Sequence, residues 1–217
     1  MRLKATAPIV FAGLAILTAP ARAETPLEIV VLGDSLVAGY ELAPGEDYPS
    51  KLEAALKQAG YDVTIVNAGV SGDTTSGGLA RLDWSVPDSA NGVILELGAN
   101  DALRGLSPDQ AAENLSEMVE RLQEREIPVM LMGMMAPPNM GADYAADFNP
   151  IYPELASEYG LELYPFFLDG VATHAEYQLA DGMHPNAAGV EVMVENTLPS
   201  VEAFIRTIRP VNGGQSK

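Results

Sequence analysis

The chain has 217 residues, which is enough for one ordinary domain with a processing segment. Its 30 acidic and 12 basic residues give a formal net charge of -18, which opposes binding to nucleic acid and other polyanions. Hydrophobic residues make up 47% of the chain, so a packed core is expected. The absence of cysteine excludes disulfides, cysteine-ligated metals and a cysteine nucleophile.

The first 23 residues have the pattern of a secretory signal peptide. Arg2 and Lys4 give a positive start, an apolar run covers residues 9–17, and Ala-Arg-Ala follows at 21–23. Cleavage is expected after Ala23, with export to the periplasm or out of the cell and no stable membrane insertion afterwards. The alternative is a membrane anchor, but the run is shorter than the roughly 20 residues that span a bilayer.

Short apolar runs alternate with helical patterns along the rest of the chain. The runs are typical of strands buried on both faces, and the predicted strands are Leu27–Leu32, Val63–Val66, Val93–Leu97, Val129–Met135 and Leu161–Phe167. The predicted helices are Pro49–Ala59, Pro108–Arg125, Phe148–Tyr159 and Ala187–Ile208, with a bend or break at Pro199. This repetition predicts an α/β fold with an open parallel sheet and helices on both faces. We expect one monomeric domain over residues 24–211 and a flexible tail at 212–217.

The ligand crevice of such a sheet lies beyond the carboxyl ends of its strands, so the residues there are the candidates for function. The first strand leads into Gly33-Asp34-Ser35-Leu36, where a serine can expose its hydroxyl next to free backbone N–H groups. Taken alone, this pattern is more often a turn with a helix N-cap. Val37 stands where the Gly-x-Ser-x-Gly elbow of α/β-hydrolases has its second glycine.

Two further strand ends carry residues that suit an oxyanion. Gly72 lies in a loop where glycine lets the backbone come close to a ligand, although this loop could simply cap a helix. The Asn100 amide can donate to a developing negative charge without titrating, although an Asx turn is its commoner use. We interpret the nearby Glu96 and Asp101 as hydrogen-bonding groups rather than acids in a reaction.

A late loop carries Asp181 and His184. Histidine titrates in the range needed to activate a serine, and a carboxylate three residues earlier can lie beside its Nδ1. Nε2 is then free to face Ser35. The other histidine, His174, has no carboxylate so placed, and we interpret it as structural or surface-exposed. The sequence has no histidine-rich metal motif and no glycine-rich phosphate loop, so no metal or cofactor is expected.

Together these blocks resemble the GDSL/SGNH hydrolases, a family named for its serine, glycine, asparagine and histidine. The matching residues are Gly33-Asp34-Ser35-Leu36, Gly72, Gly98-Ala99-Asn100-Asp101 and Asp181-Gly182-Met183-His184, with Ala99 where glycine is common. The resemblance implies a flavodoxin-like three-layer α/β/α sandwich. It also implies a triad of Ser35, Asp181 and His184. The oxyanion hole would then be made by the N–H groups of Ser35 and Gly72 and by the Asn100 side chain.

Other stretches, such as residues 78–82 and 103–106, are similar to the exported bacterial esterases of this family, whose activities include arylesterase, acyl-CoA thioesterase and lysophospholipase. The expected reaction is hydrolysis of a small acyl ester or thioester through an acyl-enzyme. The residues expected to line the acyl site are Leu103, Leu106, Pro138 and Tyr144. An acetyl-carbohydrate esterase and an acyltransferase with the same triad are alternatives, and a non-catalytic binding protein is the alternative from another class.

Overall fold

A parallel sheet of five strands forms the centre of the computed structural model, which describes residues 26–208. The predicted signal peptide and the predicted tail at 212–217 lie outside these residues. The strand order is β2-β1-β3-β4-β5. The strands are β1 (Leu27–Gly33), β2 (Val63–Gly69), β3 (Gly92–Leu95), β4 (Val129–Met132) and β5 (Glu162–Tyr164).

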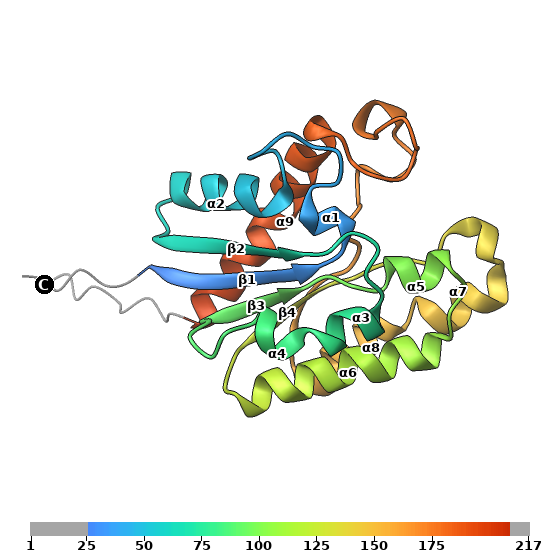
Figure 1. Cartoon of the computed structure of the whole chain (residues 1–217), viewed down its shortest axis with the longest axis horizontal. Helices are drawn as coiled ribbons and strands as arrows, with labels where there is room; N and C mark the ends of the chain where they lie inside the picture. The colour runs from blue at the N-terminus through green and yellow to red at the C-terminus, as the bar shows by residue number, and fades with distance from the viewer. Residues whose placement is uncertain (1–25, 209–217) are drawn as a thin grey trace, which may run out of the picture.

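Helices cover both faces of this sheet, so the structure confirms the predicted three-layer α/β/α fold (Figure 1). One face carries α1 (Ser35–Ala38), α2 (Tyr48–Gln58) and α9 (Ala187–Ile208). The other carries α3 (Thr75–Ala80), α4 (Leu82–Ser85), α6 (Pro108–Glu124) and α8 (Ile151–Tyr159). Beyond the carboxyl ends of the strands lie α5 (Ala99–Leu103) and α7 (Ala142–Phe148), and two short 3-10 helices span Pro138–Met140 and Ala175–Tyr177. No helix within residues 26–208 is both long and apolar enough to cross a membrane.

The central strand β1 is apolar because both of its faces are covered. Ile29, Val30 and Val31 are fully buried, and β1 pairs with β2 on one side and with β3 on the other. Side chains of a strand alternate between the two faces of its sheet, so a strand buried on both faces reads as a continuous apolar run. The chain leaves β1 and β3 toward opposite edges of the sheet, which places the topological switch point between their carboxyl ends.

Three strands end earlier in the structure than predicted: β3 ends at Leu95 rather than Leu97, and β4 and β5 are also shorter. The last hydrogen bonds between the fourth and fifth strands involve Gly133, whose N–H donates to the Tyr164 carbonyl at 2.7 Å. The chain then leaves the sheet, so Met134 and Met135 are not in β4, and Phe166 and Phe167 are not in β5. These apolar residues pack outside the sheet, which is why their hydrophobicity was a misleading signal for a longer strand.

The predicted helix over Phe148–Tyr159 is also wrong at its start. Phe148 ends α7, and α8 begins only at Ile151. Pro150 separates the two helices, because proline has no N–H to donate to the Ala146 carbonyl and so cannot continue the hydrogen bonds of α7. Asn149 lies at this break, and its side-chain oxygen accepts a hydrogen bond from the Ala136 N–H at 2.8 Å.

The last helix, in contrast, runs unbroken through Pro199. Proline has no N–H, so the Glu195 carbonyl four residues earlier loses its helical partner. Glu195 and Pro199 are both exposed, so water can bind the free carbonyl. The buried face of α9, which includes Met193, Val201 and Phe204, keeps its contacts with the core. Packing of this face therefore outweighs the local cost of the proline.

Replacing Pro199 with alanine should stabilise the protein. Pro199→Ala restores the missing N–H donor to the Glu195 carbonyl and removes the ring that crowds this carbonyl, so the free energy of unfolding should rise by about 1–3 kcal/mol. Chemical denaturation of the wild type and the variant measures this difference. Ser200→Ala, on the next residue of the same helix, is the control and should change stability by less than about 0.5 kcal/mol. A destabilised Pro199→Ala protein would contradict this account.

Candidate active site

Ser35 lies in a sharp turn between the central strand and the first helix. β1 ends at Gly33, and Asp34 is the N-cap of α1, with its Oδ1 accepting the Leu36 N–H at 2.9 Å. Ser35 is the first residue of the helix, so its own N–H has no acceptor within the helix. Its side chain is largely buried, with 9% of the residue exposed. The turn therefore holds both the hydroxyl and a backbone donor at the carboxyl end of β1.

His184 connects this serine to Asp181. Its Nε2 lies 2.9 Å from Ser35 Oγ, and its Nδ1 lies 2.6 Å from Asp181 Oδ2. The other carboxylate oxygen, Oδ1, accepts the N–H groups of Met183 and His184 at 2.9 and 3.0 Å. The hydrogen bond from the His184 ring and these two N–H groups lower the pKa of Asp181 to about 2. Asp181 is therefore ionised at every pH at which the protein is expected to work.

Tyr40 packs against the same histidine, a contact that the sequence analysis did not predict. The two ring centroids are 4.5 Å apart, with the ring planes tilted by 35°. Tyr40 comes shortly after α1, the helix that begins at Ser35, so the loop that follows α1 folds back over His184. The loop that carries His184 is also closed by a hydrogen bond from the Leu179 N–H to the His184 carbonyl, at 2.8 Å.

Two other strand ends approach the serine turn. At the end of β2, the Val70 N–H donates to the Gly33 carbonyl at 3.0 Å, which sets the following loop against the turn. Gly72 in this loop has φ +84°, a left-handed conformation that residues with a Cβ rarely adopt. From the end of β3, Asn100 Nδ2 donates to Asp34 Oδ2 at 2.8 Å, one residue before the serine. The loop that carries Gly72 and the helix that carries Asn100 are thus both hydrogen-bonded directly to the turn.

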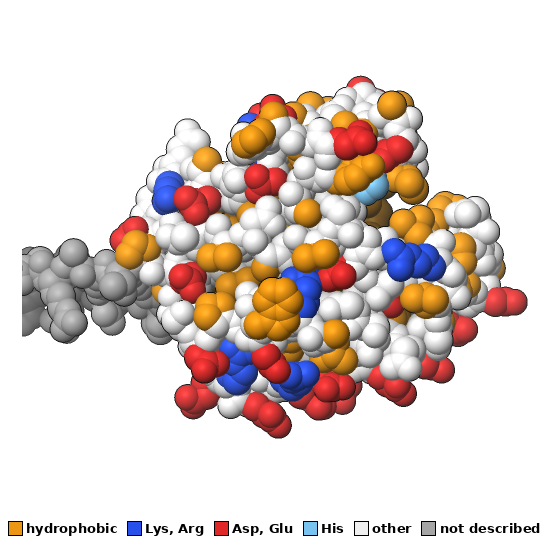
Figure 2. Space-filling model, viewed as in Figure 1, with side chains coloured by type: hydrophobic (Ala, Val, Ile, Leu, Met, Phe, Trp, Pro, Cys, Tyr) orange, Lys and Arg blue, Asp and Glu red, His pale blue; other side chains and the backbone are white. Residues whose placement is uncertain are grey.

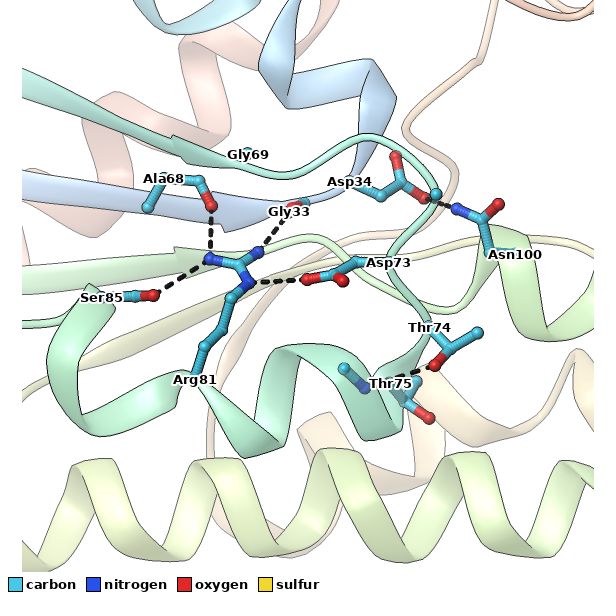
Figure 3. Close-up of polar contacts among 12 residues, drawn as sticks. Gly33, Asp34, Ala68, Gly69, Asp73, Thr74, Thr75, Arg81, Ser85 and Asn100 are labelled. Carbon is cyan, nitrogen blue, oxygen red and sulfur yellow. Dashed lines mark hydrogen bonds and ion pairs between the residues drawn. The ribbon is translucent and has the colours of Figure 1, made fainter.

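The buried guanidinium of Arg81 joins two of these loops (Figure 3). Nη2 donates to the Gly33 carbonyl at 2.9 Å, and Nη1 donates to the Ala68 carbonyl at 2.9 Å and to Ser85 Oγ at 3.1 Å. Nε donates to Asp73 Oδ2 at 2.6 Å. Because one rigid group bonds the end of β1, the end of β2 and the residue after Gly72, their relative positions are set together.

A second buried contact links the glycine loop, which carries Gly72 between β2 and α3, to α5, the helix that carries Asn100. Asp101 is 3% exposed and accepts both the Thr75 N–H at 2.8 Å and the Thr75 hydroxyl at 2.7 Å. Asn114 on α6 donates to the same hydroxyl at 2.9 Å. This bonding agrees with the interpretation of Asp101 as a structural hydrogen-bonding group. Thr74, the residue before Thr75, is the N-cap of α3, so the loop that carries Gly72 also caps a helix.

Glu96 and Asp34 form a fully buried carboxyl pair beneath the serine turn. Glu96 Oε2 accepts the Asp34 N–H at 3.2 Å, while Glu96 Oε1 has no partner among the described residues. Burial raises the pKa of Asp34 to about 6 and, together with the nearby Asp34 charge, raises the pKa of Glu96 well above its usual value. Glu96 is therefore held in its neutral form, and Asp34 is the member of the pair that carries charge.

An apolar cavity of about 410 Å³ opens between the Asn100 helix and the His184 loop. Figure 2 shows a hollow on the right of this face, with hydrophobic side chains around it and a histidine at its edge. The lining residues come from strand ends and late loops: Ala99, Leu103, Met134, Met135, Ala136, Pro137, Pro138, Phe166, Leu168, Ala172, Thr173, Gln178, Gly182 and Met183. Its volume lies in the range of small-molecule sites, about 300–1,000 Å³.

Of the four residues expected around an acyl site, Leu103 and Pro138 line this cavity. Leu106 and Tyr144 do not line it but lie next to each other, with the Tyr144 hydroxyl donating to the Leu106 carbonyl at 2.8 Å. Most of the wall was not predicted from the sequence. The apolar run at Val129–Met135 predicts a strand through Met134 and Met135, and its unusual length is the signal that could have revealed these two wall residues.

His174 lies away from these contacts. It is exposed, and its ring nitrogen Nδ1 is 3.6 Å from Glu176. Within residues 26–208, no group of three or more histidine, aspartate or glutamate side chains is arranged to hold a metal ion.

The comparison with protein families identifies this fold and site. A model of the GDSL-like lipase/acylhydrolase family matches residues 31–192. The chain belongs to this family. It is therefore an ester hydrolase of the GDSL/SGNH type, which confirms the resemblance found in the sequence.

Named members of the family match over most of their length. An arylesterase of Vibrio mimicus is 44% identical over 162 residues, which cover 73% of this chain and 80% of the relative. Thioesterase 1/protease 1/lysophospholipase L1 of Escherichia coli is 36% identical over 166 residues, covering 76% and 78%. The crystal structure of AlinE4, an SGNH-hydrolase family esterase, superposes with a TM-score of 0.71 at 50% identity and covers 84% of this chain and 98% of that one.

Replacing Arg81 should impair ester hydrolysis beyond its effect on stability. In Arg81→Lys a single ammonium cannot bond Asp73 and the carbonyls of Gly33 and Ala68 together, so kcat should fall by at least about tenfold. Steady-state hydrolysis of p-nitrophenyl butyrate and thermal unfolding measure the two effects. Arg125→Lys is the control, because Arg125 also joins a carbonyl and a carboxylate but precedes β4, at the end of the sheet opposite the serine. Equal kcat in the two variants would contradict this prediction.

Replacing Glu96 should flatten the pH dependence of stability. A carboxyl whose pKa is raised by folding stabilises the folded state at low pH, and this contribution is lost as pH rises through the folded-state pKa. The midpoint of thermal unfolding should therefore fall less for Glu96→Gln than for the wild type between about pH 5 and about pH 9. Glu195→Gln, which removes an exposed carboxylate, is the control and should follow the wild type. Parallel curves for Glu96→Gln and wild type would refute the buried neutral carboxyl.

Proposed function

We propose that the protein is a serine esterase that hydrolyses acyl esters and thioesters through Ser35, His184 and Asp181. The observation that carries this proposal is the continuous hydrogen-bonded series from Asp181 to His184 to Ser35, with lengths of 2.6 and 2.9 Å, at the edge of an apolar cavity. A serine becomes nucleophilic when a base takes its proton, and histidine does so when a carboxylate orients its ring.

In the proposed reaction, His184 Nε2 takes the Ser35 proton as Oγ attacks the carbonyl carbon of the substrate. The negative charge that develops on the carbonyl oxygen is stabilised by the N–H groups of Ser35 and Gly72 and by Asn100 Nδ2. Asn100 has two N–H hydrogens and gives one to Asp34, which leaves the other for the oxyanion.

The tetrahedral intermediate then collapses to the acyl-enzyme. His184 gives its proton to the leaving alcohol or thiol, and the acyl group stays on Ser35 Oγ. A water molecule, deprotonated by His184, attacks the same carbon. His184 then returns this proton to Ser35 Oγ as the bond to the acyl group breaks and the acid is released. Asp181 stays ionised throughout and stabilises the positive imidazolium that forms in each half of the reaction.

The cavity favours a medium acyl chain over an acetyl group. An acetyl group would leave most of a cavity of about 410 Å³ empty, whereas a longer chain can bury its methylenes against Leu103, Met134 and Phe166. Each buried CH₂ contributes about 0.8 kcal/mol, which corresponds to roughly a fourfold gain in kcat/KM. Methionine at three wall positions, Met134, Met135 and Met183, suits chains of different shape, because its side chain adapts readily.

Hydrolysis of p-nitrophenyl esters and acyl-CoA thioesters with chains of about two to sixteen carbons tests both parts of the proposal. Ser35→Ala should lower kcat by about 10⁴-fold or more on every substrate, while folding as the wild type does. Activity retained in Ser35→Ala would rule out Ser35 as the nucleophile. In the wild type, kcat/KM should rise with chain length until the cavity is filled. A preference for acetyl esters would instead favour a carbohydrate deacetylase, and ester formation with added alcohol would favour an acyltransferase.

A further inference from the structure

Arg104 differs from the other cationic side chains of this acidic protein. The structure describes seven lysine and arginine residues, and six of them form ion pairs with carboxylates: Lys51, Lys57, Arg81, Arg121, Arg125 and Arg206. Arg104 has no carboxylate partner within residues 26–208, although the chain has a net charge of -18. In a protein with such an excess of carboxylates, an exposed cation without one needs a separate explanation.

The position of Arg104 places this charge at the candidate active site. It is the C-cap of α5, the helix that carries Asn100, and it follows Leu103 of the cavity wall. Its Nη2 donates to the carbonyl of Gly72 at 2.7 Å. Figure 2 shows a Lys or Arg side chain over α5, beside the hollow. The guanidinium therefore lies against the same glycine whose N–H is proposed to stabilise the oxyanion.

Most donors of this guanidinium are free to bind a ligand. A guanidinium has five N–H donors, and within the described residues Arg104 uses only the bond to Gly72. The residue is exposed, so these donors face solvent. The carboxylates beside its two points of attachment are engaged elsewhere. Asp101, in the same helix, accepts two hydrogen bonds from Thr75, and Asp73, next to Gly72, is paired with Arg81. An anionic group that approaches the glycine loop thus meets Arg104 as its charged partner.

We propose that Arg104 forms a subsite for an anionic group, of the phosphate type, in the leaving half of the substrate. This inference rests on the proposed function, in which the acyl chain fills the apolar cavity. The alcohol or thiol half then lies outside the cavity, on the side of the glycine loop that carries Gly72. Arginine binds phosphate through two parallel N–H groups, which gives both charge and geometry. A glycerol phosphate and the phosphates of a nucleotide thioester share this chemistry.

Two matched pairs of substrates test the subsite and separate its sources. In each pair the acyl group is the same and one member lacks the phosphates. 1-Octanoylglycerol 3-phosphate is compared with 1-octanoylglycerol, which lacks only the phosphate, and octanoyl-CoA is compared with S-octanoylpantetheine, which lacks the phosphorylated nucleotide. The readout is the ratio of kcat/KM for the anionic substrate to that for the neutral one. In Arg104→Gln this ratio should fall about five- to tenfold, through KM, for at least one pair. The pair that responds identifies the source of the phosphate.

Salt and a remote charge provide the controls. An exposed ion pair is screened over about 10 Å at 0.1 M salt, so the wild-type ratio should fall toward that of Arg104→Gln as NaCl is added. Arg121→Gln removes the same charge on α6 and should keep the wild-type ratio. Unchanged ratios in Arg104→Gln for both pairs would overturn the proposal, as would an equal loss on neutral and anionic substrates. Activity of the wild type on the neutral esters, lost in Ser35→Ala, tests the esterase mechanism independently.

Discussion

The active site depends on one buried cation. Arg81 donates to the Gly33 carbonyl at the end of β1, to the Ala68 carbonyl at the end of β2 and to Asp73 in the glycine loop. Burying a charge is costly unless it is paired and hydrogen-bonded, and removal of one partner from such a pair costs about 3–5 kcal/mol. The network therefore gives the serine turn and the glycine loop a single stable arrangement, which is what a preorganised oxyanion site requires.

The protonation state of each carboxyl group at the site depends more on its surroundings than on whether the residue is aspartate or glutamate. Asp181 accepts three hydrogen bonds and has a lowered pKa, whereas burial raises the pKa values of Asp34 and Glu96. An ionised Asp181 can stabilise a histidinium, and a neutral Glu96 can fill the space beneath the serine turn without adding a second charge there. The charge at the site is thus set by the hydrogen bonds and burial of each carboxyl group, and not by the excess of acidic residues in the chain.

The cavity wall explains why the sequence-based strand boundaries were too long. Met134 and Met135 continue the apolar run of β4, but they leave the sheet after Gly133 and line the cavity instead. Hydrophobicity reports that a side chain avoids water, and it does not distinguish a sheet core from a ligand site. Tyr40 and Arg81 were missed for a related reason. Their contacts with His184 and Gly33 join residues far apart in the chain, and no local pattern encodes them.

The amino-acid sequence by itself determined the element order, the parallel sheet and the family, because strand periodicity, glycine turns and the four motif blocks are local signals. It also named Ser35, Gly72, Asn100, Asp181 and His184 as candidates. Only the tertiary structure decided that Ser35 and His184, 149 positions apart, lie within hydrogen-bond distance. It alone showed the shape of the cavity, the buried carboxyl pair and Arg104, which has no carboxylate partner within residues 26–208. These features arise where several loops meet, so they depend on packing between segments that are far apart in the sequence.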